Sequence, residues 1–266
     1  MLLALNVGNS RISVGIFDGD GNIVSKFKIA TDLKKTFDEY CVLIRMILSD
    51  NRVDIGEIES SIIASVVPQL TDTVRLVAKR LSKSEPIIVG PGVKTGFLIK
   101  IDSPSELGGD MVANTAAVIH KKKVGGKTNS PSVVVDMNTV TTVSAINGND
   151  EYIGCCIIPG IQMSFESMHE TTALLPNVNF ASAKNAIGKN SHDSVRSGVL
   201  CGNAIMLDGF VYRFAKEMRC KPDDIDLTIT GEYAKYVVKL CSRTFSYDED
   251  LTLRGLYVIH QNNINR

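Results

Sequence analysis

The stretch LLALNVGNS (residues 2–10) is an apolar run that ends in a polar turn containing glycine, and its pattern recurs later in the chain. The second copy is SVVVDMNT (residues 132–139), in which Asp136 corresponds to Asn6 and Asn138 to Gly8, an offset of 130 residues. Each copy continues into a second apolar strand and then a hairpin signal, DGDGN (18–22) or NGND (147–150). Agreement across three consecutive features predicts two similar half-chains.

The rest of the chain alternates expected strands with expected helices. Thr36 and Glu39 form a capping box that opens a helix, and apolar spacing predicts further strands at 61–66, 86–89 and 227–230 and helices at 70–81, 104–122, 160–169, 191–218 and 232–240. This order predicts an α/β protein of two packed domains, 1–125 and 126–266, with a cleft between them. Gly198, Gly202 and Gly209 lie near one face of the longest helix, as a closely packed neighbouring helix would need.

Composition narrows the function classes. The 266 residues are 44% hydrophobic and 22% charged, which is typical of a globular chain and excludes a disordered or coiled-coil protein. Lys and Arg together number 29, as do Asp and Glu, so we expect no direct nucleic-acid binding. The run KKK (121–123) is expected to be a solvated helix end. No segment approaches the roughly 20 apolar residues of a membrane span, and the apolar start stops too early, at Asn6, for a signal peptide.

The cysteines and histidines show no metal-ligand spacing. The six cysteines include no CxxC pair, and the four histidines are scattered. We therefore expect no zinc site and a reducing, cytoplasmic compartment. Cys155 and Cys156 lie in an apolar run, so buried thiols are expected there.

The duplicated turns suggest a chemistry. A strand that ends in an acid or amide and turns through Gly, Asn, Ser or Thr presents backbone N–H groups and hydroxyls that can hold phosphates, and the acid can hold a cation. Either turn alone is equally typical of an ordinary hairpin. Their duplication, with hydroxyls at Ser10 and Thr139, favours phosphate binding.

Further motifs run in order across nearly the whole chain: NVGNS (6–10), ELGGDM (106–111), VDMNTVTT (135–142), the segment 154–160, the segment 172–176, IGKNS (187–191), TGE (230–232) and LTLRGL (251–256). In this set the chain resembles the type III pantothenate kinases, also called the Bvg accessory factor family, of the actin/Hsp70/sugar-kinase superfamily. The resemblance implies two RNase H-like domains and the ATP-dependent phosphorylation of pantothenate, the first step of coenzyme A synthesis.

The resemblance also implies roles for individual residues. Asp110 is the expected general base, and Asp136 is expected to hold a monovalent cation, K⁺ or NH₄⁺. The expected ATP-binding residues, acting with Mg²⁺, are Asn6, Val7, Gly8, Asn9, Ser10, Arg11, Ile12, Ser13 and Thr139. The expected substrate-binding residues are Ile101, Gly108, Gly109, Asp110, Met111 and Ser191. A homodimer is expected, with the substrate pocket completed near the long helix.

Four positions depart from the family pattern. Asn6 stands where the family has aspartate, Asn138 where it has glycine, Met111 where it has arginine and Ile101 where many members have tyrosine. Asparagine tolerates the positive φ that a glycine turn can require, although its side chain would intrude near the phosphate. Two alternatives therefore stay open: a catalytically impaired member with a binding or regulatory role, and a kinase for another small hydroxyl substrate.

Overall fold

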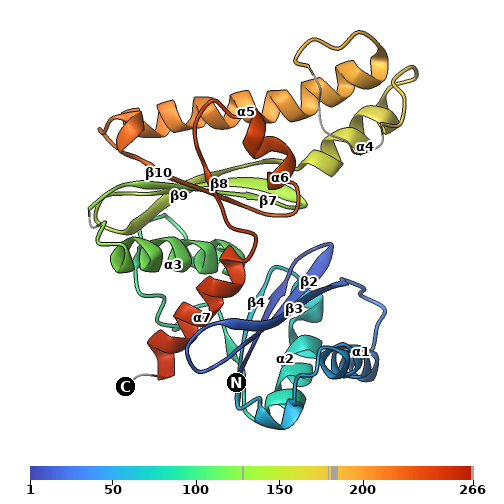
Figure 1. Ribbon diagram of the computed structural model, residues 1–266, viewed down its shortest axis with the longest axis vertical. Helices are drawn as coiled ribbons and strands as arrows, with labels where there is room; N and C mark the ends of the chain where they lie inside the picture. The colour runs from blue at the N-terminus through green and yellow to red at the C-terminus, as the bar shows by residue number, and fades with distance from the viewer. Residues whose placement is uncertain (128, 179, 181–184, 265–266) are drawn as a thin grey trace. The chain divides into compact units, whose positions relative to one another are not determined.

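The computed structural model describes residues 1–127, 129–178, 180 and 185–264, and the chain divides into two compact units. Unit 1 contains Met1–Phe97, Asp102–Lys121 and the segment from Asp250 onwards, and unit 2 contains Leu98–Ile101 and Lys122–Glu249. Figure 1 shows the helices and strands of both units.

Unit 1 is built on a five-stranded sheet with the order β3-β2-β1-β4-β5. Strands β1, β2 and β3 form an antiparallel meander, and β4 and β5 then add in parallel beside β1. The strand bounds are Leu2–Val7 (β1), Arg11–Phe17 (β2), Ile23–Ala30 (β3), Ser60–Ser65 (β4) and Ile87–Ile88 (β5). The central strand β1 is buried along almost its whole length, as expected for a strand covered on both faces.

Helices cover both faces of this sheet (Figure 1). Alternate β1 residues Leu3, Leu5 and Val7 join one buried apolar cluster with α1 (Phe37–Asp50) and α2 (Pro68–Ser82). The predicted capping box is present at the start of α1. Helix α7 (Leu251–Ile264) packs on the opposite face. The contact is close at Gly15 of β2, where an added Cβ would lie 3.1 Å from Leu253. Helix α3 (Gly109–Val124) completes the helical set.

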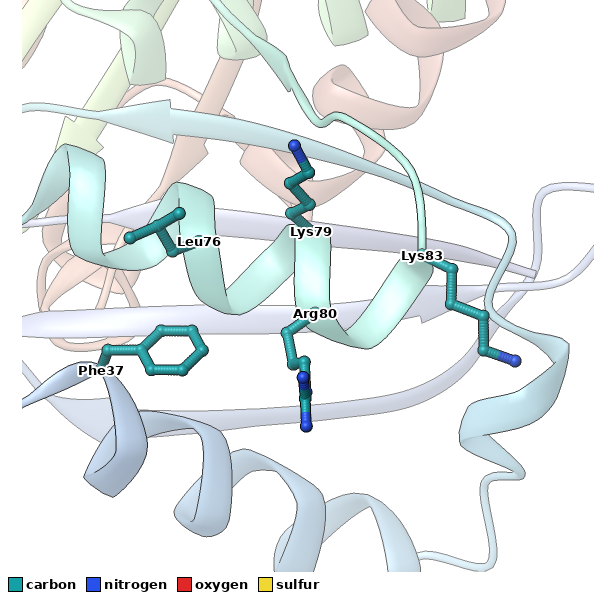
Figure 2. Close-up of a pocket in the computed structure, with 5 residues that line it drawn as sticks. All are labelled: Phe37, Leu76, Lys79, Arg80 and Lys83. Atoms are coloured by element: carbon teal, nitrogen blue, oxygen red, sulfur yellow. The ribbon is translucent and has the colours of Figure 1, made fainter.

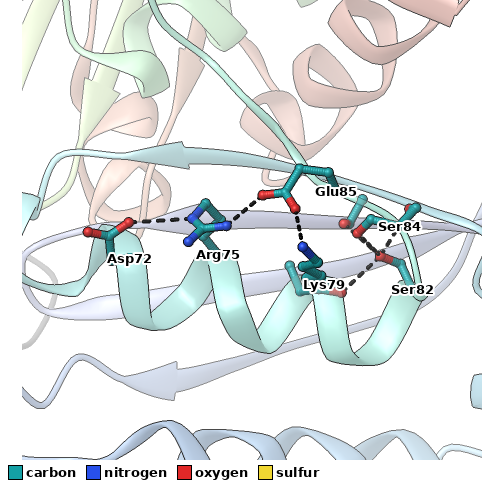
Figure 3. A network of polar contacts seen from close by, with 8 residues as sticks. Asp72, Arg75, Lys79, Ser82, Ser84 and Glu85 are labelled. Atoms are coloured by element: carbon teal, nitrogen blue, oxygen red, sulfur yellow. Dashed lines mark hydrogen bonds and ion pairs between the residues drawn. The ribbon is translucent and has the colours of Figure 1, made fainter.

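The outer surface of α2 carries an ion-pair network (Figure 3). Arg75 lies between Asp72 at 3.4 Å and Glu85 at 2.6 Å, and Lys79 Nζ is 2.7 Å from the second oxygen of Glu85. Exposed pairs contribute only about 0–1 kcal/mol each. The network links α2 to Glu85, which lies on the connection from α2 to β5, and adds little to stability.

Unit 2 is built on a six-stranded sheet with the order β11-β10-β7-β8-β9-β6. Strands β7, β8 and β9 form an antiparallel meander, and β10 and β11 add in parallel beside β7. The strand bounds are Leu98–Ile99 (β6), Ser132–Met137 (β7), Val140–Ile146 (β8), Glu151–Pro159 (β9), Asp226–Thr230 (β10) and Ser246–Tyr247 (β11). Helices α4 (Ile161–Thr171), α5 (Ser191–Glu217) and α6 (Ala234–Val237) pack onto β7 and β8 through one apolar core.

The two sheets share one topology, which confirms the internal repeat predicted from the sequence. The order β3-β2-β1-β4-β5 matches β9-β8-β7-β10-β11, with antiparallel and parallel pairs in the same places. The β1–β2 turn and the β7–β8 turn are therefore equivalent positions in the two units. Strand β6 is an additional edge strand of unit 2.

The division of the chain differs from two consecutive halves. It passes between Lys121 and Lys122, close to the expected boundary at 125, but the last helix returns to unit 1. The reason is apolar burial, since Leu251, Leu253 and Leu256 of α7 are buried against the first sheet. The expected helix from residue 104 also begins later, at Gly109, after a single 3₁₀ turn.

Two local expectations were wrong, one at Lys122 and one at Cys155 and Cys156. Lys121 and Lys123 are exposed at the end of α3, as expected. Lys122 is instead 5% exposed, and its Nζ lies 2.8 Å from Asp150 Oδ1 and donates to the Ser130 carbonyl. Cys155 is exposed and Cys156 is partly exposed, because β9 alternates its side chains outward. The three glycines of α5 have no close neighbour among the described residues of the chain, since an added Cβ would contact nothing within 4 Å at Gly198, Gly202 or Gly209. Close packing against a second chain therefore stays a prediction.

Candidate active site

The turn between β1 and β2 is held by its own backbone and by one threonine. The Gly8 amide donates to the Arg11 carbonyl at 3.0 Å, which closes the turn. Thr31, just after β3, donates its hydroxyl to the Gly8 carbonyl at 2.6 Å and its amide to the Ser10 carbonyl at 3.0 Å. The predicted ATP-binding segment from Asn6 to Ser13 is therefore an ordered loop at the carboxyl end of β1.

Asn6 brings an unsatisfied acceptor to this loop. Its Oδ1 is buried and has no hydrogen-bond partner among the described residues. A buried, unpaired amide oxygen costs free energy unless a ligand, water or cation supplies the missing interaction. Oxygen donors are the ligands that Mg²⁺ prefers, so Asn6 fits as one neutral ligand or water acceptor at a magnesium site.

The start of α3 packs against the same edge of the first sheet. A Cβ on Gly109 would lie 3.2 Å from the Ala64 Cβ and 3.5 Å from the Ser65 amide nitrogen, so only glycine allows this close approach without a shift. Ala64 is paired in register with Asn6. The structure thus brings the predicted residues Gly109 and Asp110 to the strand ends that carry the β1–β2 turn.

Asp110 occupies the first turn of α3, where the helix dipole favours a negative charge. Its Oδ1 accepts a hydrogen bond from the Met111 amide at 2.8 Å. Dense protein surroundings raise the pKa of Asp110, and the Met111 hydrogen bond opposes the rise without cancelling it. The side chain keeps partial solvent access. A partly accessible carboxylate with a raised pKa can accept a proton from a substrate hydroxyl.

The turn between β7 and β8 in unit 2 is built differently from its equivalent. Asp136 is the last but one residue of β7, which is buried along its whole length, and it is 5% exposed. Asn138 Nδ2 donates to Asp136 Oδ1 at 2.6 Å, and Asn138 Oδ1 accepts from the Glu232 amide at 3.1 Å. Asn138 has no positive φ, so the expected reason for tolerating asparagine here was wrong.

Two glycines clamp this turn, and their role was not predicted. A Cβ on Gly231, which has φ +100°, would lie 2.5 Å from the Met137 amide nitrogen and carbonyl oxygen. A Cβ on Gly160 would overlap the Thr139 carbonyl and lie 2.6 Å from the Asn138 carbonyl. The available signal was that both glycines fall within family-like segments (154–160 and 230–232).

A monovalent cation on Asp136 Oδ1 would compete with this arrangement. One carboxylate oxygen already accepts the Asn138 amide at a short distance. A cation that took the place of this donor would displace the side-chain amide, which is itself held at its other end by the Glu232 backbone amide. The expected K⁺ or NH₄⁺ site at Asp136 therefore stays a prediction.

The other predicted substrate residues are distributed between the units. Gly108 and Met111 lie in unit 1 with Asp110, whereas Ile101 and Ser191 lie in unit 2. Ser191 is the first residue of α5, directly after Asn190, whose side chain caps the helix by accepting from the Asp193 amide.

A separate cavity of about 490 Å³ lies between α1 and α2 (Figure 2). It is lined by Phe37, Leu76, Lys79, Arg80 and Lys83. None of these residues belongs to the two turns or to the start of α3. The cavity is therefore not the candidate active site.

The repeated sheets and their helices define an actin-like ATPase or sugar-kinase fold with two RNase H-like units. Similar solved structures include a Campylobacter jejuni protein provisionally classed as a Baf family transcriptional activator, with TM-score 0.57 and 18% identity over 99% of this chain and 100% of that chain. The activator of 2-hydroxyisocaproyl-CoA dehydratase from Clostridium difficile, with bound ADPNP, gives TM-score 0.54 and 10% identity over 98% and 95%. A Listeria monocytogenes protein provisionally classed as an N-acetylmannosamine kinase gives 0.56 and 11% over 98% of both chains. At these identities the likeness shows the fold alone.

The family follows from a direct match of the sequence. The model of the type III pantothenate kinase family matches residues 2–213, and the chain belongs to this family. Family and fold together support a kinase phosphotransferase that binds ATP, in general with Mg²⁺. Among the described residues, no helix combines the length and hydropathy that a bilayer crossing requires.

Proposed function

We propose that this protein transfers the γ-phosphoryl group of ATP to the primary hydroxyl of pantothenate, giving 4′-phosphopantothenate. The observation that carries the proposal is the position of Asp110. The start of α3 packs on Ala64, beside Asn6 and the β1–β2 turn, so a carboxylate with a raised pKa lies at the edge that carries the predicted ATP loop. The family match supports pantothenate as the acceptor.

Asp110 acts as the general base in this reaction. The substrate hydroxyl oxygen forms a new bond to the γ-phosphorus, the bond from that phosphorus to the β–γ bridging oxygen breaks, and ADP leaves. The hydroxyl proton passes to an Asp110 carboxylate oxygen. Phosphoryl transfer depends mainly on positioning and charge stabilisation, so the base assists a reaction that the bound groups have already aligned.

The ATP phosphates are assigned to the β1–β2 turn of unit 1, and a role for the Thr139 hydroxyl stays a prediction from the family resemblance. In the first turn, the hydrogen bonds from Thr31 to Gly8 and Ser10 keep the loop in one conformation. The unsatisfied Asn6 oxygen is our candidate contact for Mg²⁺ or its water shell. Mg²⁺, when bound with ATP, neutralises charge on the phosphates.

The decisive experiment is ATP turnover against a panel of acceptors, measured as ADP release with product identification by mass spectrometry. Pantothenate should be phosphorylated. Its KM should be higher than in family members that have arginine at the position of Met111. Phosphorylation of a different acceptor only would overturn the pantothenate assignment. ATP binding without turnover on any acceptor would instead favour the catalytically impaired, regulatory alternative.

A second candidate, a kinase for another small hydroxyl substrate, is favoured by Met111. An arginine at this position could hold a substrate carboxylate through two parallel hydrogen bonds, whereas methionine can make neither. An acceptor that lacks a carboxylate would suffer no such loss. The panel should therefore contain hydroxyl compounds with and without a carboxylate, including pantothenate and its neutral alcohol analogue.

We also propose that the protein is a homodimer that pairs through α5. Gly198, Gly202 and Gly209 share a helix face with Ile205 and Tyr212, which are 69% and 58% exposed. Glycines on such a face would allow a second helix to approach closely. Light scattering should give twice the chain mass, and Ile205→Arg should give a monomer. A monomeric wild type at micromolar concentration would count against the proposal.

A cytoplasmic location is part of the same proposal. All six cysteines are free, which suits a reducing compartment. Fractionation of cells that produce the protein would test this assignment.

A further inference from the structure

The side chain of Asn138 is bound at both ends, in an orientation that its partners determine. Its Nδ2 lies 2.6 Å from Asp136 Oδ1, and its Oδ1 lies 3.1 Å from the Glu232 amide nitrogen. An ionised carboxylate can only accept and a backbone amide can only donate. The reversed amide would face an acceptor with its oxygen and a donor with its nitrogen, so only one orientation satisfies both contacts.

The surroundings keep this side chain in place. The backbone N–H of Asn138 donates to the Val140 carbonyl at 3.1 Å, and the backbone N–H of Tyr233 donates to the Met137 carbonyl at 3.1 Å. The close backbone approach of Gly160 and Gly231 then encloses the turn from both neighbouring segments. The side-chain amide of Asn138, bound to Asp136 and to the Glu232 backbone, thus forms an amide bridge that joins the end of β7 to the loop after β10 in a fixed geometry.

The bridge supplies the interaction that a cation on Asp136 would supply. A buried carboxylate needs a positive partner or strong donors, and Asp136 is 5% exposed. The amide N–H is such a donor, and hydrogen bonds to charged groups are the stronger kind. A cation that took the place of the Asn138 side-chain amide would break its bond to Asp136 and move it away from Glu232, so two hydrogen bonds would be lost.

We propose that the side-chain amide of Asn138 replaces a monovalent cation at Asp136, so that this protein needs neither K⁺ nor NH₄⁺ for its stability or its activity. Asn138 acts here as a positioning residue, because it fixes Asp136 and the loop after β10. The consequence for activity rests on the proposed kinase function. The consequence for cation binding does not, because it concerns the folded protein alone.

The test compares the wild type with Asn138→Gly, which opens the space beside Asp136. Phosphoryl transfer is measured in KCl, NH₄Cl and choline chloride at constant ionic strength, and Tm is measured in the same salts. The wild type should give the same rate and the same Tm in all three. Asn138→Gly should lose at least about tenfold in rate in choline chloride, equivalent to about 1.4 kcal/mol, and K⁺ or NH₄⁺ should restore the rate and raise Tm.

Two further variants complete the design. Asn149→Gly makes the same change at an exposed position of the β8–β9 turn and should show no cation response. Asn138→Ser, whose side chain is too short to reach both partners, should behave like Asn138→Gly and serves if the glycine variant does not fold. A wild type whose rate or Tm rises specifically with K⁺ would overturn the proposal, as would folded Asn138 variants without a cation response. If pantothenate is not phosphorylated at all, the Tm comparison still decides the cation question.

Discussion

Replacing Asp110 with asparagine tests both the chemistry and the electrostatics at the edge of the first sheet. Asparagine has nearly the same shape, and its Oδ1 can still accept the 2.8 Å hydrogen bond from the Met111 amide. The substitution therefore removes the charge and leaves the packing in place. With the general base removed, turnover should fall by about 10²–10⁴-fold, and ATP affinity should hardly change.

The same substitution should stabilise the folded protein at neutral pH. Burial raises the pKa of Asp110 above its ordinary value of 3.8, so the folded chain binds this proton more tightly than the unfolded chain. The contribution of Asp110 to stability is therefore most favourable below pH 3.8 and declines as pH rises to the folded pKa. Within that window each pH unit changes the free energy of unfolding by up to about 1.4 kcal/mol.

The assay is thermal unfolding of the wild type and Asp110→Asn across acid to neutral pH, alongside steady-state kinetics. A gain of 1 kcal/mol should appear as a Tm rise of roughly 2–4 °C for a chain of this size, and the gain should vanish in acid. Asp20→Asn, an exposed position of the β2–β3 turn, is the matched control and should change neither quantity. Unchanged turnover would refute the assignment of the base. Unchanged stability at neutral pH would refute the electrostatic reasoning.

Three other substitutions test neighbouring parts of the structure. Asn6→Asp should lower the Mg²⁺ concentration at half-maximal rate, since a charged oxygen replaces a neutral one; a higher requirement would show that Asn6 does not face the metal. Met111→Arg should lower the KM for pantothenate by about 10–100-fold, because hydrogen bonds to charged groups contribute roughly 1.5–3 kcal/mol; an unchanged KM would place the carboxylate elsewhere. Gly255→Ala places a Cβ against the Ala113 carbonyl and should cost about 1–3 kcal/mol of unfolding free energy. Gly19→Ala, whose Cβ would meet nothing within 4 Å, should be close to neutral in the same denaturation assay, and equal losses would argue against the packing of α7 on α3.

Several features could be predicted from the sequence because neighbouring residues determine them. The capping box at Thr36 and Glu39 depends on residues three positions apart, and the structure contains it. Strands, turns and their repetition at an offset of 130 residues follow from apolar runs and hairpin residues close together in the chain. The two-sheet α/β architecture was therefore predictable, as was the equivalence of the β1–β2 and β7–β8 turns.

The candidate site was predictable only in part. The segments NVGNS (6–10) and ELGGDM (106–111) carried the family resemblance. The adjacency of Asn6, Gly109 and Asp110 depends instead on the pairing of β1 with β4 and on the packing of α3 against Ala64. The raised pKa of Asp110 has the same origin, since it comes from the protein atoms that surround the carboxyl group. Spacing along the chain carries no information about either.

By itself, the sequence determined the repeated strand–turn–strand units, the helix start at Thr36 and the family to which the chain belongs, because these depend on local spacing and residue type. Only the tertiary structure decided how individual polar groups are satisfied. Asn138 binds Asp136 two residues away but also Glu232, 94 residues away, and Lys122 of α3 forms an ion pair with Asp150 of the β8–β9 turn. The last helix likewise joins unit 1 because the uncovered face of that sheet buries its leucines. Such partners are brought together by strand register and side-chain packing, which act between residues far apart in the chain.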